Sequence, residues 1–344
     1  MRTPGRLDGL DAARGVAVVS MLAAHLAPGG PVLELGERLA APLFAVVLGV
    51  SMGVLLHDRQ PTAGWFLLQN LERAVLLVVL GVLLSPLYPP VVVVLPHLGL
   101  LIAVLAPLAL LLHRAPVLTV GVAAAGAVLG PIVRERVQAA WGTADAVDGQ
   151  RWTGELLDWL VLGDQYRVTS FLPMALGGLA LATVLRRVSE PPEAYAVAGV
   201  LLVGAAAAYL LGRGTTEGAA SFSGSTAEVV GGTLLAMGTV VASFLLLATA
   251  RRLGVGRWLD PVVVTGRLAL TAYTVQIVLL ALLGALPGGA DDDSWLVLAS
   301  TTALVLGTCW ALDRWWGTGP LEWVVHRLRP APPRVGRHVR TGAA

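Results

Sequence analysis

The chain has 344 residues, of which 56% are hydrophobic and 13% are charged. Soluble domains carry about a quarter charged residues, so this composition excludes an ordinary soluble domain and indicates an integral membrane protein. All 24 basic residues are arginine, the net charge is only +2, and the single cysteine, Cys309, excludes a disulfide framework or a cysteine metal site within one chain.

Apolar runs of about twenty residues, the length that crosses a bilayer, recur along the chain and are separated by proline, glycine or charge. We predict ten spans, near 10–28, 40–57, 70–88, 91–112, 116–133, 168–186, 193–212, 228–250, 261–286 and 295–313. The charged residues of the first span argue against a cleaved signal peptide. The expected fold is an all-α, polytopic integral membrane helical bundle of about ten transmembrane helices, with residues 1–326 as one domain.

Arginine placement predicts the orientation. With an even number of spans both termini share a side, and most of the arginines fall on that side, so both termini are expected in the cytoplasm. The segment 134–167 is then external, and its stretch WTGELLDWLVLG predicts a short amphipathic helix at the membrane interface. Residues 327–344 predict a disordered basic cytoplasmic tail. We expect the chain in the cell (cytoplasmic) membrane as a multi-pass protein.

The first span carries charge where a plain anchor would not. Asp11, Arg14 and His25 fall on one face of the helix, with Arg14 and His25 separated by roughly 16 Å along its axis. Ionisable groups in a span usually face a protein interior or a water-filled cavity, which makes all three candidate functional residues. The simpler reading is that Arg14 is an interfacial anchor paired with Asp11, and that His25 lies hydrogen-bonded near the outer interface.

Two more arginines, Arg73 and Arg267, open later spans at the same predicted boundary as Arg14. Converging guanidinium groups would suit a phosphorylated ligand, whereas each residue taken singly is readily explained as an anchor. His97 begins a span at a depth similar to that of His25, either as a second proton-handling group or as an interfacial histidine. The spacing of Gly49 and Gly53 predicts close helix packing.

The stretches LDGLDAARGVAVVSMLAAHL and PLFAVVLGVSMG resemble the opening of bacterial membrane proteins related to heparan-alpha-glucosaminide N-acetyltransferase. YRVTSFLPMALGGLALA, TGRLALTAYTVQ and GPLEW resemble the C-terminal half of an uncharacterised bacterial membrane family often joined to that opening. The spacing of Arg14 and His25 is also similar to that in integral-membrane acyltransferases that modify surface glycans.

The resemblance implies an acyltransferase that moves an acetyl or other acyl group from cytoplasmic acyl-CoA to an amine or hydroxyl of a glycan or other envelope acceptor. The heparan enzymes place a catalytic histidine in the loop after the first helix, but GGPVLELGER contains none, so His25 is the candidate, as a general base or as a transient acyl carrier. Asp11 and His97 are further catalytic candidates, and Arg14, Arg73 and Arg267 are the candidate CoA ligands, with no metal.

Two rival functions stay open. A transporter or flippase would use Asp11, Arg14 and His25 as a proton relay, and a non-catalytic membrane scaffold would use none of them. The expected partners are the lipid bilayer and a small-molecule or glycan acceptor, with no nucleic acid, and a homodimer is left open.

Overall fold

The computed structural model describes residues 8–88, 90–142, 151–187, 191–214, 218–285 and 294–328, and these residues form helices and connections without a strand. In this part of the chain nine helices are long and apolar enough to cross a membrane, and the number is ten if one bent pair counts as a single span. The prediction of an all-α polytopic bundle of about ten transmembrane helices is confirmed. Most of the predicted tail, residues 329–344, lies outside the described residues.

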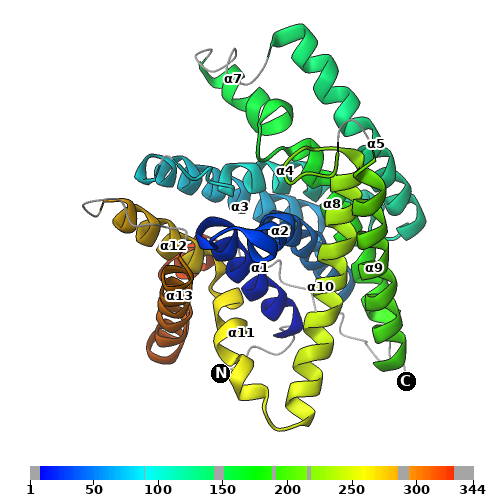
Figure 1. Cartoon of the computed structure of the whole chain (residues 1–344). Coiled ribbons are helices and arrows are strands. Elements are labelled where there is room, and N and C mark those ends of the chain that lie inside the picture. The colour runs from blue at the N-terminus through cyan, green and yellow to red at the C-terminus, as the bar shows by residue number, and fades with distance from the viewer. Residues whose placement is uncertain are drawn as a thin grey trace, which may run out of the picture.

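The helices follow one another with short connections (Figure 1). Their bounds are α1 Asp8–Leu26, α2 Gly30–Arg59, α3 Ala63–Leu84 with the 3₁₀ turn η1 Ser85–Leu87, α4 Leu95–Leu112, α5 Pro116–Trp141, α7 Arg151–Leu157 with the π turn η2 Asp158–Leu162, α8 Val168–Arg187, α9 Pro191–Gly212, α10 Thr226–Arg252 with the 3₁₀ turn η3 Gly256–Leu259, α11 Asp260–Arg267, α12 Ala269–Gly284, α13 Trp295–Trp316 and α14 Pro320–Leu328.

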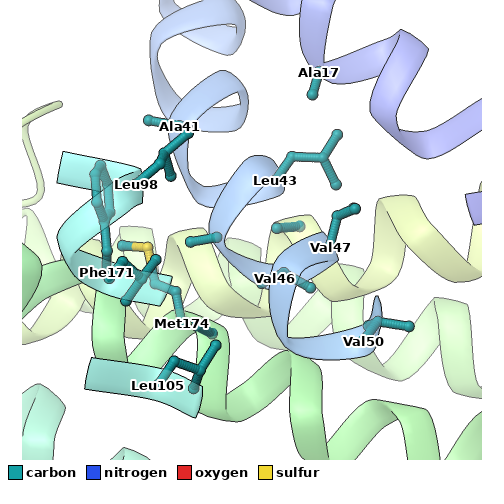
Figure 2. Packing of buried hydrophobic residues seen from close by; sticks show 14 of the residues in the cluster. Ala17, Ala41, Leu43, Val46, Val47, Val50, Leu98, Leu105, Phe171 and Met174 are labelled. Carbon is teal, nitrogen blue, oxygen red and sulfur yellow. The ribbon is translucent and has the colours of Figure 1, made fainter. Parts of the chain in front are cut away.

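Helix α2 forms the centre of the core. Its central part, 39–56, is apolar apart from Ser51 and mostly buried, the pattern of a buried helix, and α2 packs against α1, α8, α10 and α4. Figure 2 shows Leu43 and Val46 of α2 with side chains from α1, α4 and α8 around them. Helices α5, α9 and α13 are largely exposed in the described structure, as expected of apolar helices at a surface that faces lipid.

Glycine allows α2 and α8 to approach closely. A Cβ built on Gly49 would lie 1.8 Å from the carbonyl oxygen of Ala175, and one on Gly178 would lie 2.1 Å from that of Val46. A Cβ on Gly53 would lie 2.6 Å from Ala182 Cβ. The predicted close packing at Gly49 and Gly53 is therefore confirmed.

The ninth predicted span, 261–286, is not one straight helix. Helices α11 and α12 are bent by 84° between Arg267 and Ala269. Gly266 holds α11 against α1, because its Cβ would lie 1.7 Å from the carbonyl oxygen of Asp11. Beyond the bend, Glu322 of α14 accepts hydrogen bonds from the backbone N–H groups of Leu270 and Thr271. The carboxylate thus replaces the carbonyl acceptors that a preceding helical turn would provide.

Two further boundaries differ from the sequence prediction. Helix α2 begins at Gly30, so the segment expected as a loop after the first span is its first turns, and Pro31 stands at a position that proline favours. Helix α5 continues to Trp141, so the segment expected to be external from residue 134 begins inside a helix. Helix α7 and η2 occupy most of the stretch expected as an amphipathic helix.

The helix ends define two ends of the bundle. The outer end holds Leu26, Leu95, α7 with η2, and the loop 218–225, and the inner end holds Asp8, Arg59 and the α10–η3 turn. In Figure 1 α7 lies at the top and the turn between α10 and α11 at the bottom. Ion pairs join inner helix ends: Arg186 with Asp58 at 2.6 Å, and Arg251 with Asp8. The cytoplasmic location of the inner end remains a prediction from arginine placement.

Candidate active site at the outer end of α1

A cavity of about 100 Å³ lies at the outer end of α1. Its walls come from five regions of the sequence: the last turns of α1, the second and later turns of α2, the connection before α4, the connection before α8, and the loop 218–225. Among the lining residues are Met21, His25, Glu37, Phe44, Tyr166 and Phe222. The cavity therefore brings an imidazole, a carboxylate and a phenol together in one recess.

His25 reaches this cavity from the last turn of α1, which ends at Leu26 shortly before Pro28. Its side chain is half-buried, so it stays accessible from the cavity. Glu37 is also half-buried and comes from the part of α2 that the sequence analysis took for a loop. Both side chains line the cavity, and a neutral imidazole that shares a cavity with a carboxylate can act as a proton acceptor.

Tyr166 supplies the third polar group of the cavity. Burial, with a smaller contribution from the negative charge of Glu37, raises the pKa of Tyr166 to about 12. The phenol is therefore protonated at neutral pH, and its O–H can donate a hydrogen bond to an oxyanion or a carbonyl. The ring lies edge-on to Phe222, with a centroid distance of 5.7 Å.

His97 lies behind Tyr166 and does not line the cavity. Its side chain is buried at 3% exposure, its Nδ1 has no hydrogen-bond partner, and its ring lies 5.7 Å from that of Tyr166 and 6.3 Å from that of Trp159. His97 therefore contacts Tyr166 from outside the cavity that His25 and Tyr166 line.

The loop 218–225 closes the cavity on another side and is held by charged residues. Arg38 donates to the carbonyl of Ala219 at 2.9 Å, and Arg134 donates to that of Ser223 at 3.2 Å. Arg167 donates to the carbonyl of Phe222 at 2.5 Å. Glu228 accepts from the N–H groups of Phe222 and Gly224. The loop carries Phe222 into the cavity wall with φ at +64°, which is uncommon for phenylalanine.

Asp11 and Arg14 lie at the inner half of α1 and form an ion pair at 2.6 Å, as their spacing suggested. Arg14 also donates to Ser51 of α2 at 2.6 Å. Asp11 is almost fully buried, whereas Arg14 keeps 26% of its side chain exposed. Between this pair and the cavity, Ala17 and Val18 are completely buried, so α1 is packed over that interval.

The other two candidate CoA ligands are on separate helices. Arg267, at the end of α11, pairs with Asp313 of α13 at 2.5 Å and keeps 24% of its side chain exposed. Arg73 is half-buried on α3, which packs chiefly against α4. The described residues contain no group of three or more histidine, cysteine, aspartate or glutamate side chains that could hold a metal ion.

Four residues that help to form the outer site are not among the candidates predicted from sequence: Glu37, Tyr166, Arg167 and Phe222. Proline is common in the first turn of a helix, so Pro31 could have indicated that a helix begins there and includes Glu37. The other three lie in connections, and only tertiary contacts bring them to α1.

Residues 180–330 match the model of a family described as a protein of unknown function (DUF418). The matched segment runs from α8 to just beyond α14 and includes the bent crossing. The family consists of multi-pass membrane proteins. A comparison with curated proteins found no match. The chain is thus a multi-pass membrane protein whose C-terminal part is similar to this family, and His25 and Glu37 lie outside the matched segment.

Proposed function

We propose that the protein is an integral membrane acyltransferase that moves an acetyl or other acyl group from acyl-CoA, bound from the inner end, to an amine or hydroxyl of an acceptor at the outer end. The observation that carries the proposal is the cavity at the outer end of α1, where His25, Glu37 and Tyr166 meet. These are the groups that acyl transfer without a metal requires: a base, a charge partner and an oxyanion donor.

In the proposed reaction, His25 takes the proton of the acceptor amine or hydroxyl, which attacks the thioester carbonyl. Tyr166 donates its O–H to the developing oxyanion, and Glu37 balances the charge of the imidazolium. The tetrahedral intermediate then expels the CoA thiolate, which takes the proton from His25. The products are the acylated acceptor and free CoA.

The CoA phosphates would bind at the inner end, where Arg14 and Arg267 are both partly exposed. Each guanidinium is held by a carboxylate, so phosphate has to compete with Asp11 or Asp313. The thioester arm would then run along α1 toward His25, over an interval that is packed at Ala17 and Val18 in this conformation. Transfer across the bundle therefore requires these contacts to open.

The test is thioester consumption by the purified protein in proteoliposomes, with acetyl-CoA as donor and glucosamine as the acceptor probe. We expect His25→Ala to lower CoA release by about 10²-fold or more, because a positioned base contributes at least that factor, while thermal stabilisation by CoA persists. His326→Ala removes an exposed histidine of α14 and is the matched control. Equal activity of the His25→Ala protein would remove His25 from the reaction.

A transporter is the second candidate, and the bend between α11 and α12 favours it. Broken helices are common at the substrate sites of secondary transporters, where their free termini face the ligand. A transporter would accumulate labelled glucosamine inside proteoliposomes without consuming acetyl-CoA. Measurements on the same proteoliposomes therefore distinguish an acyltransferase from a transporter.

A further inference from the structure

Arg167 is a buried cation whose hydrogen-bonding capacity is only partly used. Its side chain is 2% exposed, Nη2 donates to the carbonyl of Phe222, and Nε and Nη1 have no hydrogen-bond partner. Burying a guanidinium is costly unless its donors are satisfied, so two unused donors are not explained by stability alone.

A second arginine increases this positive charge. Arg134 lies close enough to act on Arg167, and its own Nε is buried without a partner. Burial, followed by the charge of Arg134, lowers the pKa of Arg167 to about 10, so the group is still cationic at neutral pH. Three carboxylates act on Arg167: Glu228 is engaged by the loop backbone, Asp164 is 80% exposed and reaches Arg134 at 3.4 Å, and Asp158 opens η2 and has a weaker effect.

The loop 218–225 lies directly over Arg167. A Cβ on Gly224 would lie 2.7 Å from Nη2 of Arg167, so the backbone touches the guanidinium. On its other side the loop supplies Phe222 to the cavity that contains His25. Arg167 is therefore one layer behind the cavity wall, and the residue in front of it has an uncommon backbone conformation.

We infer that Arg167 is an oxyanion-binding group, which a phosphate or carboxylate on a ligand in the outer cavity reaches when the loop 218–225 moves aside. The anion would replace the carbonyl of Phe222 and use the donors that are now free, since guanidinium matches the geometry of both oxyanions. That this ligand is the acceptor rests on the proposed function. The anion site itself does not, and it can be tested without any thioester.

The test measures the unfolding temperature of the purified protein while phosphate replaces chloride at fixed ionic strength. We expect phosphate to stabilise the natural protein. In Arg167→Gln the half-saturating phosphate concentration should rise about tenfold or more, because losing one hydrogen bond to a charged group weakens binding by about that factor. Absence of stabilisation in the natural protein, or an equal effect in Arg167→Gln, would overturn the inference.

Arg38→Gln is the matched control, because Arg38 holds the same loop through the carbonyl of Ala219. Its loss loosens the cover without removing the anion ligand, so phosphate should bind as well or better. Similar weakening in Arg38→Gln and Arg167→Gln would show that Arg167 only anchors the loop. If Arg167→Gln does not fold, Phe222→Ala provides the test. Loss of the phenyl ring uncovers Arg167, so the half-saturating phosphate concentration should fall. An unchanged or higher concentration would contradict the inference.

Reconstitution distinguishes the sources of the oxyanion. Bilayers with phosphatidylglycerol, compared with phosphatidylcholine alone, present phosphate as a lipid headgroup. Stabilisation by phosphatidylglycerol that depends on Arg167 would identify a lipid ligand, and stabilisation only by inorganic phosphate would identify a soluble one. Both results support the site.

Discussion

Buried charged side chains differ in their hydrogen-bond partners between the two ends of the bundle. At the inner end, Asp11 is buried at 1% exposure, but Arg14 pairs with it within the same helix. At the outer end, Arg167 is equally buried and keeps two donors without a partner. Local pairing indicates a structural role for the inner pair, whether or not it also binds CoA. The unused donors at the outer end indicate a ligand.

Removing Arg14 should lower the free energy of unfolding, because Asp11 stays buried without its ion-pair partner. We expect Arg14→Gln to destabilise the protein by about 1–3 kcal/mol, because it leaves the carboxylate of Asp11 buried without its cation. The double variant Asp11→Asn/Arg14→Gln should recover most of this loss. The unfolding temperature in detergent measures both. Arg186→Gln, which breaks an exposed pair with Asp58, is the control and should change stability by less than about 1 kcal/mol.

The sequence predicted the residue contacts that lie within one helix and missed those between distant segments. The pairing of Asp11 with Arg14 follows from three-residue spacing and is confirmed. His25 was selected because ionisable groups are rare in apolar spans. Tyr166, Arg167 and Phe222 gave no such signal, because they lie in connections and their partners are far away in sequence, 55 residues for Arg167 with Phe222 and more for Tyr166 with His97.

At the level of elements, the crossing of α2 and α8 depends on glycine rather than on large side chains. Lipid supplies no hydrophobic force between apolar helices, so close approach of backbones has to provide the packing energy. The contacts of Gly49 and Gly178 leave no room for a methyl group. The same crossing positions α2, which carries Glu37 into the outer cavity.

We expect Gly49→Ala and Gly178→Ala each to destabilise the protein by about 1–3 kcal/mol, since the added methyl forces the two backbones apart. Gly121→Ala and Gly199→Ala are the matched controls, because a Cβ at either position meets nothing within 4 Å. They should leave stability unchanged or raise it slightly through helix propensity. Thermal unfolding in one detergent compares all four, and equal losses would contradict a packing role.

Element boundaries show what hydropathy can and cannot predict. All ten apolar runs correspond to helices, because an apolar run of that length is sufficient for a span. The bend at Arg267 is not visible in hydropathy, since the apolar run continues across it. It depends on Gly266 against α1 and on Glu322 from α14, contacts that the sequence does not reveal.

For the whole molecule, alternating helices place every part of the candidate active site at the end opposite the Arg-rich helix termini. The connection before α8 and the loop 218–225 meet His25 there. The bias in arginine placement predicts that this end faces outward. The acceptor would then be outside the cell and the acyl donor inside.

Thiol labelling tests this orientation. Cys309 is buried, so Cys309→Ala gives a background without cysteine. We expect Ala220→Cys, at an exposed position of the outer loop, to react with a membrane-impermeant maleimide on intact cells, and Val255→Cys, exposed near the inner end, to react only after lysis. The reverse pattern would place the cavity of His25 in the cytoplasm and exclude transfer to an external acceptor.

The bend of the tenth crossing also affects the surrounding lipid. Helix α12 has 16 residues, about 24 Å of helix, whereas the hydrocarbon layer measures about 30 Å. Because α11 and α12 meet at 84°, the two halves cannot both lie along the membrane normal, and neighbouring acyl chains have to shorten or tilt to match the short helix that crosses. The protein should therefore be surrounded on this flank by a locally thinned membrane.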